Sequence, residues 1–206
     1  MRALIRRGRS NSLVELVVLV AVALFLALTV QAYAVKPYRI PSGSMEPTLT
    51  IGQRVIVDRL THRLGSSPHV GDIVVFNPPA GADAERCGMG GQGEGTSSPC
   101  SVPVAQKAHE TFIKRVVAVG GDTLSIRDGH VIRNGKLASE PFAASCGGGP
   151  DCNFPQAIKV PKGYVFMMGD NRGESDDSRF WGPVPVSWVI GRAVVTYWSP
   201  DRIGTL

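Results

Sequence analysis

A run of 20 residues without a charge, residues 16–35, constrains this chain of 206 residues more than any other feature. Glu15 is the only charge between residues 13 and 35. As a helix, such a run is about 30 Å long, which is the thickness of the hydrocarbon core of a bilayer. We therefore expect one transmembrane anchor at residues 13–35. Residues 36–206 then form one domain large enough to bury a sizeable core.

The charges around this run predict its orientation. Four arginines, all before residue 10, lie in residues 1–12, and the positive-inside rule places such a basic N-terminus in the cytoplasm. The domain then lies outside the cytoplasm. The alternative is a cleaved signal peptide, because Ala32-Tyr33-Ala34 matches a small-x-small cleavage site. The length of the run favours a retained anchor, since signal-peptide cores have about 7 to 15 apolar residues.

The overall charge is mildly positive. The formal net charge is +5, and residues 1–35 hold +3 of it as four arginines and one glutamate, which leaves +2 for residues 36–206. This balance suits an anionic lipid surface. We therefore expect a lipid bilayer as a partner and no nucleic acid.

Four cysteines form two close pairs, Cys87 with Cys100 and Cys146 with Cys152, each in a glycine-rich stretch. Outside the cytoplasm, such pairs are typical of disulfides that close surface loops. Zinc is the competing interpretation, but neither pair has the C-x-x-C spacing and the four histidines are scattered. We expect disulfides and no metal. Sequential pairing is the simplest connectivity, although the other pairings stay open.

Short alternating apolar runs separated by Gly, Pro, Asn and Asp predict an all-β extracytoplasmic domain behind one N-terminal transmembrane helix. Asp128-Gly129 and Asn134-Gly135 are typical hairpin turns. The expected strands are residues 38–40, 54–58, 72–76, 111–119, 123–127, 130–133, 164–168 and 189–198. Two loop insertions interrupt them. Residues 77–107 predict a mobile surface loop, and residues 138–162 a small cap between strands.

Lys114 is the candidate base. In the run at residues 112–119 it shares one face with Phe112, Val116 and Ala118, so it is the only charge on an apolar face, while Arg115 points to water. Lost hydration disfavours the ammonium and lowers the pKa of such a lysine. A lysine snorkelling from a strand edge is the competing interpretation. A catalytic Ser-His-Asp triad is the alternative source of a base, but it fits poorly. The histidine nearest to any motif is His109, five residues before Lys114, and no Asp or Ser pattern frames it.

Three segments together point to a known family. They are PSGSMEPTL at residues 41–49, FIKRVVAVGGD at 112–122 and GDNRGESDDSRFWG at 169–182. In this order they resemble the type I signal peptidases, which are membrane-bound Ser-Lys serine proteases that remove signal peptides from exported proteins. The resemblance extends over most of residues 13–198. It departs at Phe112, where many members have tyrosine, and at Gly120, where many have proline.

This resemblance implies roles for six residues. Ser44 matches the nucleophile and Lys114 the general base, a pairing that is a recognised form of activated serine. Ser42 matches the serine whose hydroxyl joins the Ser44 N–H in the oxyanion hole. Ser175 matches the serine that hydrogen-bonds to and orients the lysine. Asp177 and Arg179 match the acid and base that hold the site together, although an ordinary surface ion pair is the alternative.

The resemblance also implies the reaction. We expect an endopeptidase that cleaves signal peptides after small residues at −1 and −3, without metal or cofactor. Ile40, Pro41 and Met45 would line the cleft, where the substrate adds to a sheet edge as a strand. The tryptophans Trp181 and Trp188 would rest at the lipid surface. Two alternatives remain: a surface-anchored β-domain that binds a partner without catalysis, and a Ser-Lys protease of another class.

Overall fold

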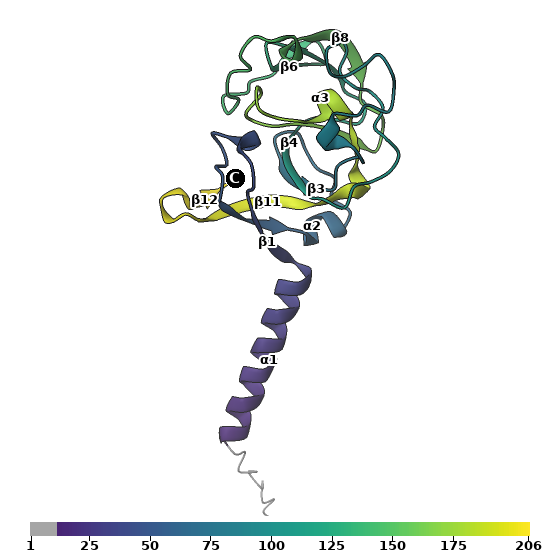
Figure 1. The fold of residues 1–206 in the computed structure, drawn as a ribbon. Helices are drawn as coiled ribbons and strands as arrows, with labels where there is room; N and C mark the ends of the chain where they lie inside the picture. Colours follow the sequence, from purple (N-terminus) through teal and green to yellow (C-terminus); the bar gives the residue numbers. More distant parts are fainter. Residues whose placement is uncertain (1–11) are drawn as a thin grey trace, which may run out of the picture.

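The computed structural model describes residues 12–206, and for residues 29–33 it describes the backbone only. Helix α1 (Ser12–Tyr33) extends away from a β-rich domain and leads into strand β1 (Val35–Arg39), as Figure 1 shows. Within the described residues, no helix is both long and apolar enough to cross a bilayer. Apart from Ser12, the predicted basic segment at residues 1–12 lies outside the described residues.

The larger sheet contains β4 (Phe112–Val119), the strand that carries the candidate base Lys114. In the described part of the chain it has eight strands, and its pairings are all antiparallel. Along the sheet the order is β1, β2 (Arg54–Asp58), β11 (Val189–Trp198), β3 (Ile73–Phe76), β4, β9 (Tyr164–Met168) and β10 (Val184–Pro185), with β12 (Gly204–Thr205) on β11. β4 therefore lies inside the sheet, which holds its side chains in defined directions.

A smaller sheet covers one side of the domain. Its order is β7 (Lys136–Leu137), β6 (His130–Arg133), β5 (Thr123–Arg127) and β8 (Phe154–Lys159). Asp128 and Gly129 connect β5 to β6 with positive φ angles of 48° and 75°, which is the hairpin turn expected from Asp-Gly. The expected all-β class is therefore confirmed for the described domain.

Alternation along β3 separates two hydrophobic cores. Val74 and Phe76 pack into the larger core, whereas Ile73 and Val75 pack into the smaller one. Successive side chains of a strand point to opposite faces, so adjacent residues enter different cores. Trp181 is fully buried in the larger core, with its ring centroid 5.9 Å from that of Phe76. The prediction that it rests on lipid is wrong, and Trp188 also packs against this core.

The two predicted insertions contain more secondary structure than their composition indicated. Residues 77–107 contain η2 (Ala82–Ala84) and pack against α3 (Ser178–Trp181), where Cys100 N donates to Arg179 O at 2.8 Å. Residues 138–162 contain η3 (Pro150–Cys152) and β8, a strand that the sequence did not reveal. The remaining short helices are α2 (Leu60–Arg63), η4 (Val186–Trp188) and η5 (Pro200–Arg202).

Candidate active site

Ser44 and Lys114 meet although they are 70 residues apart in the chain. Ser44 lies in the 3₁₀ turn η1 (Gly43–Met45), which we call the nucleophile turn, and Lys114 lies on β4. Lys114 Nζ is 2.7 Å from Ser44 Oγ, a hydrogen-bond distance. Both side chains are buried, with 8% of Ser44 and 4% of Lys114 exposed. The lysine therefore does not snorkel to water.

The surroundings of Lys114 favour its neutral form. Burial lowers the pKa of the Lys114 amine to about 8, and the nearby charges of Asp177 and Asp176 oppose this shift only in part. A neutral amine can accept a proton, which an ammonium cannot. Near pH 8 a large fraction of Lys114 is thus able to act as a base toward Ser44.

Ser42 lies beside Ser44, the predicted nucleophile. Its hydroxyl Oγ donates to Ser44 Oγ at 3.4 Å, and its backbone is extended just before the nucleophile turn. This arrangement brings the expected oxyanion donor into the site.

The structure does not form the bond expected of Ser175. Its Oγ is buried and has no hydrogen-bond partner among the described residues, so the bond to Lys114 is absent here. The hydroxyl instead packs against Gly169. A Cβ at Gly169 would lie 2.2 Å from Ser175 Oγ and 2.4 Å from Ser44 O, so a larger side chain there would displace one of them.

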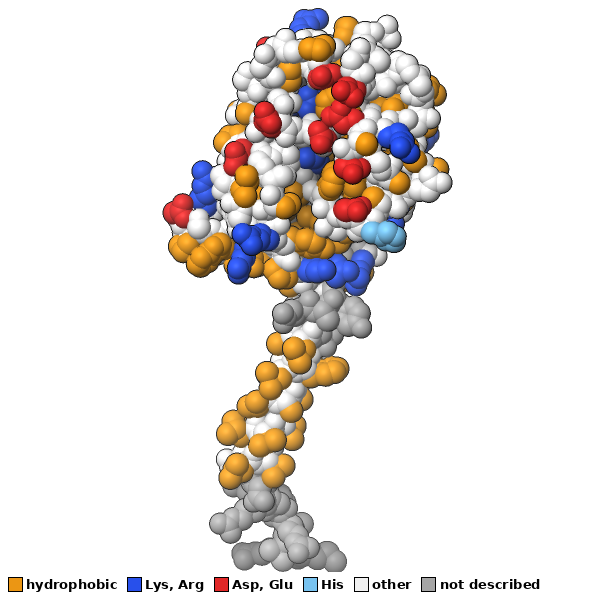
Figure 2. Space-filling model, in the orientation of Figure 1, with side chains coloured by type: hydrophobic (Ala, Val, Ile, Leu, Met, Phe, Trp, Pro, Cys, Tyr) orange, Lys and Arg blue, Asp and Glu red, His pale blue; other side chains and the backbone are white. Residues whose placement is uncertain are grey.

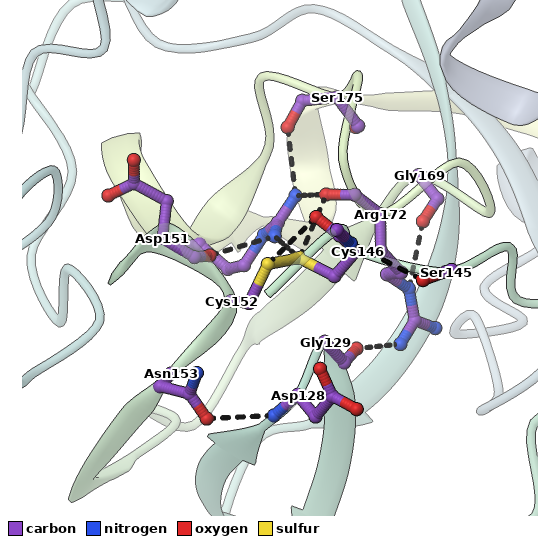
Figure 3. Close-up of a disulfide and its surroundings, with 12 residues drawn as sticks. Asp128, Gly129, Ser145, Cys146, Asp151, Cys152, Asn153, Gly169, Arg172 and Ser175 are labelled. Atoms are coloured by element: carbon purple, nitrogen blue, oxygen red, sulfur yellow. Dashed lines mark hydrogen bonds between the residues drawn. A yellow bond between two sulfur atoms is a disulfide. The ribbon is translucent and has the colours of Figure 1, made fainter. Parts of the chain in front are cut away.

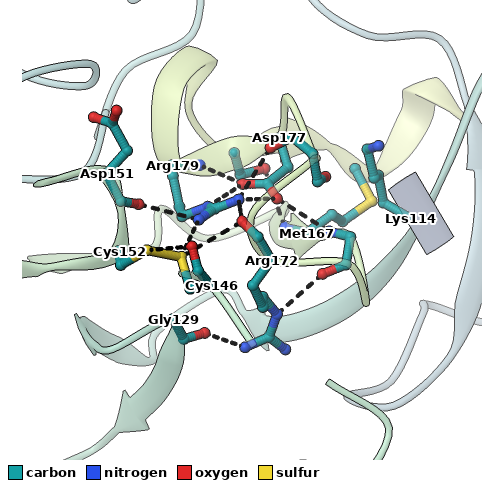
Figure 4. Close-up of polar contacts among 12 residues, drawn as sticks. Lys114, Gly129, Cys146, Asp151, Cys152, Met167, Arg172, Asp177 and Arg179 are labelled. Carbon is teal, nitrogen blue, oxygen red and sulfur yellow. Dashed lines mark hydrogen bonds and ion pairs between the residues drawn. A yellow bond between two sulfur atoms is a disulfide. The ribbon is translucent and has the colours of Figure 1, made fainter. Parts of the chain in front are cut away.

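Asp177 and Arg179 form an ion pair inside the protein rather than on its surface. The Arg179 Nε donates to Asp177 Oδ1 at 2.8 Å, and at most 1% of either side chain is exposed (Figure 4). Burial opposes ionisation of Asp177, but the charge and hydrogen bonds of Arg179 outweigh it and hold the pKa of Asp177 below its usual value. Asp177 Oδ2 also accepts from Gly169 N at 3.0 Å. The surface-pair alternative is therefore wrong.

The sequence did not reveal two further ion pairs, one partly buried and one buried. Arg115 does not point to water as predicted, because Asp170 holds its Nη2 at 2.7 Å and the ring of Phe142 lies 3.9 Å from its guanidinium carbon. Arg172 pairs with Glu140 at 2.8 Å. Asp170 and Arg172 lie within the third motif. Their partners lie 55 and 32 residues away, so no local spacing marks the pairs.

A cleft of about 390 Å³ opens beside the two reactive groups. Ile40 and Pro41 line it as expected, but Met45 is fully buried in the smaller core and does not line it. A 3₁₀ turn rotates each successive residue by about 120°, so Ser44 faces the cleft while Met45 faces the core. The other lining residues are Tyr38, Arg39, Ser42, Ser44, Val75, Thr111, Phe112, Ile113, Lys114, Glu174 and Asp176.

Both cysteine pairs form disulfides in the sequential pairing, so none of the four thiols is free to bind zinc. Figure 3 shows the bridge between Cys146 and Cys152 with Asp151 and Arg172 near it, and Figure 4 shows Arg179 and Asp177 beside the bridge. Arg179 Nη1 lies 3.8 Å from Cys146 Sγ and donates to Asp151 O at 3.1 Å. This loop therefore supplies part of the frame around Asp177.

A serine and a buried lysine at hydrogen-bond distance in a cleft form the arrangement of a Ser-Lys serine hydrolase. The profile of the family described as signal peptidase, peptidase S26, matches residues 13–198. The chain therefore belongs to the signal peptidase family.

Relatives that the chain matches over most of their length support this assignment. A probable signal peptidase I-1 of Synechocystis is 36% identical over 93% of this chain and 86% of its own length. The signal peptidase I of Mycobacterium tuberculosis is 34% identical over 98% of this chain and 78% of its own. A solved signal peptidase I from Enterococcus faecalis has 26% identity and a TM-score of 0.41, covering 62% of this chain and 97% of that one, which is too little to support an argument.

Proposed function

We propose that this protein is a membrane-anchored signal peptidase that removes N-terminal signal peptides from exported preproteins, cleaving after small residues at −1 and −3. One observation carries the proposal: Lys114 Nζ lies 2.7 Å from Ser44 Oγ beside a cleft of about 390 Å³. The names of the relatives support the substrate class.

In the proposed reaction, neutral Lys114 takes the proton of the Ser44 hydroxyl while Oγ attacks the scissile carbonyl carbon. The resulting oxyanion accepts hydrogen bonds from the Ser44 N–H and the Ser42 hydroxyl. The Lys114 ammonium then returns the proton to the leaving amine, which leaves the signal peptide as an ester on Ser44. Water, deprotonated by Lys114, then attacks the ester carbonyl, and the Lys114 ammonium returns the proton to Ser44 Oγ as the signal peptide leaves with a free carboxyl terminus.

The backbone of β4 offers a place for the substrate. β3 pairs with β4 on one side from Phe112 to Arg115, whereas on the other side the described partner strand β9 begins only at Arg115. The backbone of residues 112–114 can therefore pair with an extended peptide in the cleft. Apolar walls from Ile40, Val75 and Ile113 suit the apolar side chains of a signal peptide.

The membrane anchor is part of this proposal and rests on the 20-residue uncharged run in the sequence. Support comes from α1, whose apolar side chains are exposed along its length, from Leu13 at 75% to Leu28 at 63%. Figure 2 shows Lys and Arg side chains gathered at the end of the domain nearest this helix, where they would meet anionic headgroups. The N-terminus would be cytoplasmic and the catalytic domain extracytoplasmic.

A preprotein cleavage assay with the full chain in lipid vesicles tests the activity. We expect the wild type and Ser67→Ala, which changes an exposed serine outside the cleft, to release the mature protein at equal rates. Ser44→Ala should release none, because the nucleophile is gone. Cleavage by Ser44→Ala at the wild-type rate would refute the proposal and favour a non-catalytic domain.

Labelling of intact cells tests the topology. A membrane-impermeant amine reagent should label lysines after residue 35, such as the exposed Lys107. Labelling only after the cells are lysed would refute the proposed orientation.

A further inference from the structure

The loop after β9 contacts the nucleophile turn through one residue, Asn171. Its side-chain Nδ2 donates to Gly43 O at 3.2 Å, and its backbone N donates to Ser44 O at 3.1 Å. Asn171 therefore binds the backbone carbonyl of the residue before Ser44 and the backbone carbonyl of Ser44 itself.

The chain on both sides of Asn171 is fixed. Asp170 and Arg172 are at most 2% exposed, and each belongs to an ion pair. Asp170 Oδ2 also accepts from Thr48 Oγ1 at 2.5 Å, and Asp170 O accepts from Ala144 N at 2.8 Å. These contacts fix the backbone on both sides of Asn171, and so they fix the position of Asn171 next to the nucleophile turn.

The direction of the Ser44 N–H depends on the carbonyl that Asn171 holds. The C=O of Gly43 and the N–H of Ser44 belong to one planar trans peptide, so they point in opposite directions. Asn171 Nδ2 and Glu46 N, at 3.0 Å, both donate to Gly43 O. Holding that oxygen in place therefore also holds the N–H that lies opposite to it.

We propose that Asn171 is a positioning residue that aims the Ser44 N–H at the oxyanion of the transition state. The inference rests on the proposed function, because it takes Ser44 as the nucleophile and its N–H as an oxyanion donor. The side-chain bond of Asn171 goes to a backbone carbonyl and not to Lys114 or the Ser44 hydroxyl. Its loss should therefore affect the stabilisation of the transition state, and neither peptide binding nor the titration of the base.

Two substitutions separate this role from general damage to the fold. Asn171→Ala should lower kcat by about 10-fold to 100-fold, the scale of a misaligned oxyanion donor, with KM within about twofold and the acid limb of the pH profile unmoved. Asn171→Asp keeps the outline of the side chain but has no side-chain N–H to donate. Its kcat, measured on the plateau of its own pH profile, should therefore fall at least as far as that of Asn171→Ala. Asn153→Ala is the matched control, since its amide bonds to Asp128 N in a turn outside the cleft.

Inhibitors give a readout that a merely structural role would not change. The Ser44 Oγ–H adds across the C=O of a substrate-like peptide aldehyde, which forms a hemiacetal whose former carbonyl oxygen lies where the oxyanion would. The affinity of this aldehyde for Asn171→Ala should fall by the factor by which kcat/KM falls. A peptide with CH₂ in place of the scissile carbonyl has no such oxygen, so its affinity should stay at the wild-type value.

Two outcomes would overturn the inference: a kcat of Asn171→Ala within about twofold of the wild type, or an equal loss of affinity for both inhibitors. Ser44→Ala, measured alongside, separates this failure from that of the proposed function. If Ser44→Ala is inactive and Asn171→Ala behaves as wild type, only the role of Asn171 is wrong. If Ser44→Ala cleaves at the wild-type rate, the proposed function itself fails.

Discussion

Arg179 holds the Asp177 carboxylate with two hydrogen bonds in the protein interior, from Nε to Oδ1 at 2.8 Å and from Nη2 to Oδ2 at 3.0 Å. Replacing one partner leaves the other charge buried and unpaired, which costs about 3 to 5 kcal/mol. We therefore expect Asp177→Asn to lower the free energy of unfolding by that amount, as measured by urea denaturation. Asp201→Asn, which changes a fully exposed acid, should have little effect.

The same substitution should change the pH profile. Among the charges that raise the pKa of Lys114, Asp177 has the largest effect, so its removal lowers this pKa further. The acid limb of kcat/KM should then move to lower pH in the folded Asp177→Asn variant. An acid limb that stayed in place or moved to higher pH would show that Asp177 does not act on Lys114.

The two disulfides should differ in their importance. Chain entropy alone favours the longer loop, with about 3 kcal/mol for Cys87–Cys100 and roughly 2 kcal/mol for Cys146–Cys152. However, the shorter loop also supplies Asp151 O to the buried Arg179. We therefore expect the Cys146→Ser/Cys152→Ser variant to lose more thermal stability than Cys87→Ser/Cys100→Ser. Both should keep cleavage at low temperature, because neither bridge touches Ser44 or Lys114. The reverse order of melting temperatures would leave chain entropy as the sufficient explanation.

Alternation predicted most strands of this fold. The expected bounds of β2, β5, β6, β9 and β11 agree with the structure. Buried and less buried residues alternate regularly in β2 and β5, whereas β9 is a short apolar run that is buried on both faces. Strand β8 was missed, since it follows a glycine-rich disulfide loop, contains Pro155, and buries only Phe154 and Ile158. The two-residue strands β7, β10 and β12 are too short to show any alternation.

The candidate site depended more on family resemblance than on pattern. The strand at residues 112–119 indicated a lysine on an apolar face, but only the resemblance connected it to Ser44, 70 residues earlier. Spacing alone did not predict the burial of Met45 or the partners of Asp170 and Arg172, because these depend on how distant segments pack. The roles implied for Ser44, Lys114, Ser42, Ser175, Asp177 and Arg179 stay predictions.

Glu85 gives the fold a second pH dependence. Burial first, and then a hydrogen bond and charge from Asp176, raise the pKa of Glu85 from 4.5 to about 8. Between these values the folded chain holds a proton that the unfolded chain has lost, so the stability falls as the pH rises through this window. Glutamine imitates the protonated acid. The melting temperature of Glu85→Gln should therefore equal that of the wild type near pH 4.5 and exceed it at pH 9.

Thermal unfolding at the two pH values checks this expectation. Asp83→Asn, which changes an exposed acid in the same loop, should show no comparable gain at pH 9. If Glu85→Gln were less stable than the wild type at pH 9, repulsion between the carboxylates of Glu85 and Asp176 would not be the cause of the lower stability at high pH.

The dependence of kcat/KM on pH, measured for the wild type and Lys114→Arg, tests the Ser-Lys assignment most directly. Because burial lowers the pKa of Lys114 to about 8 and the base must be neutral, wild-type activity should fall as the pH drops through about 8. Lys114→Arg should be inactive at every pH, since a guanidinium stays protonated, whereas Lys107→Arg at an exposed site should match the wild type. Substantial cleavage by Lys114→Arg, or an acid limb near 6.5 as for a histidine, would contradict the account.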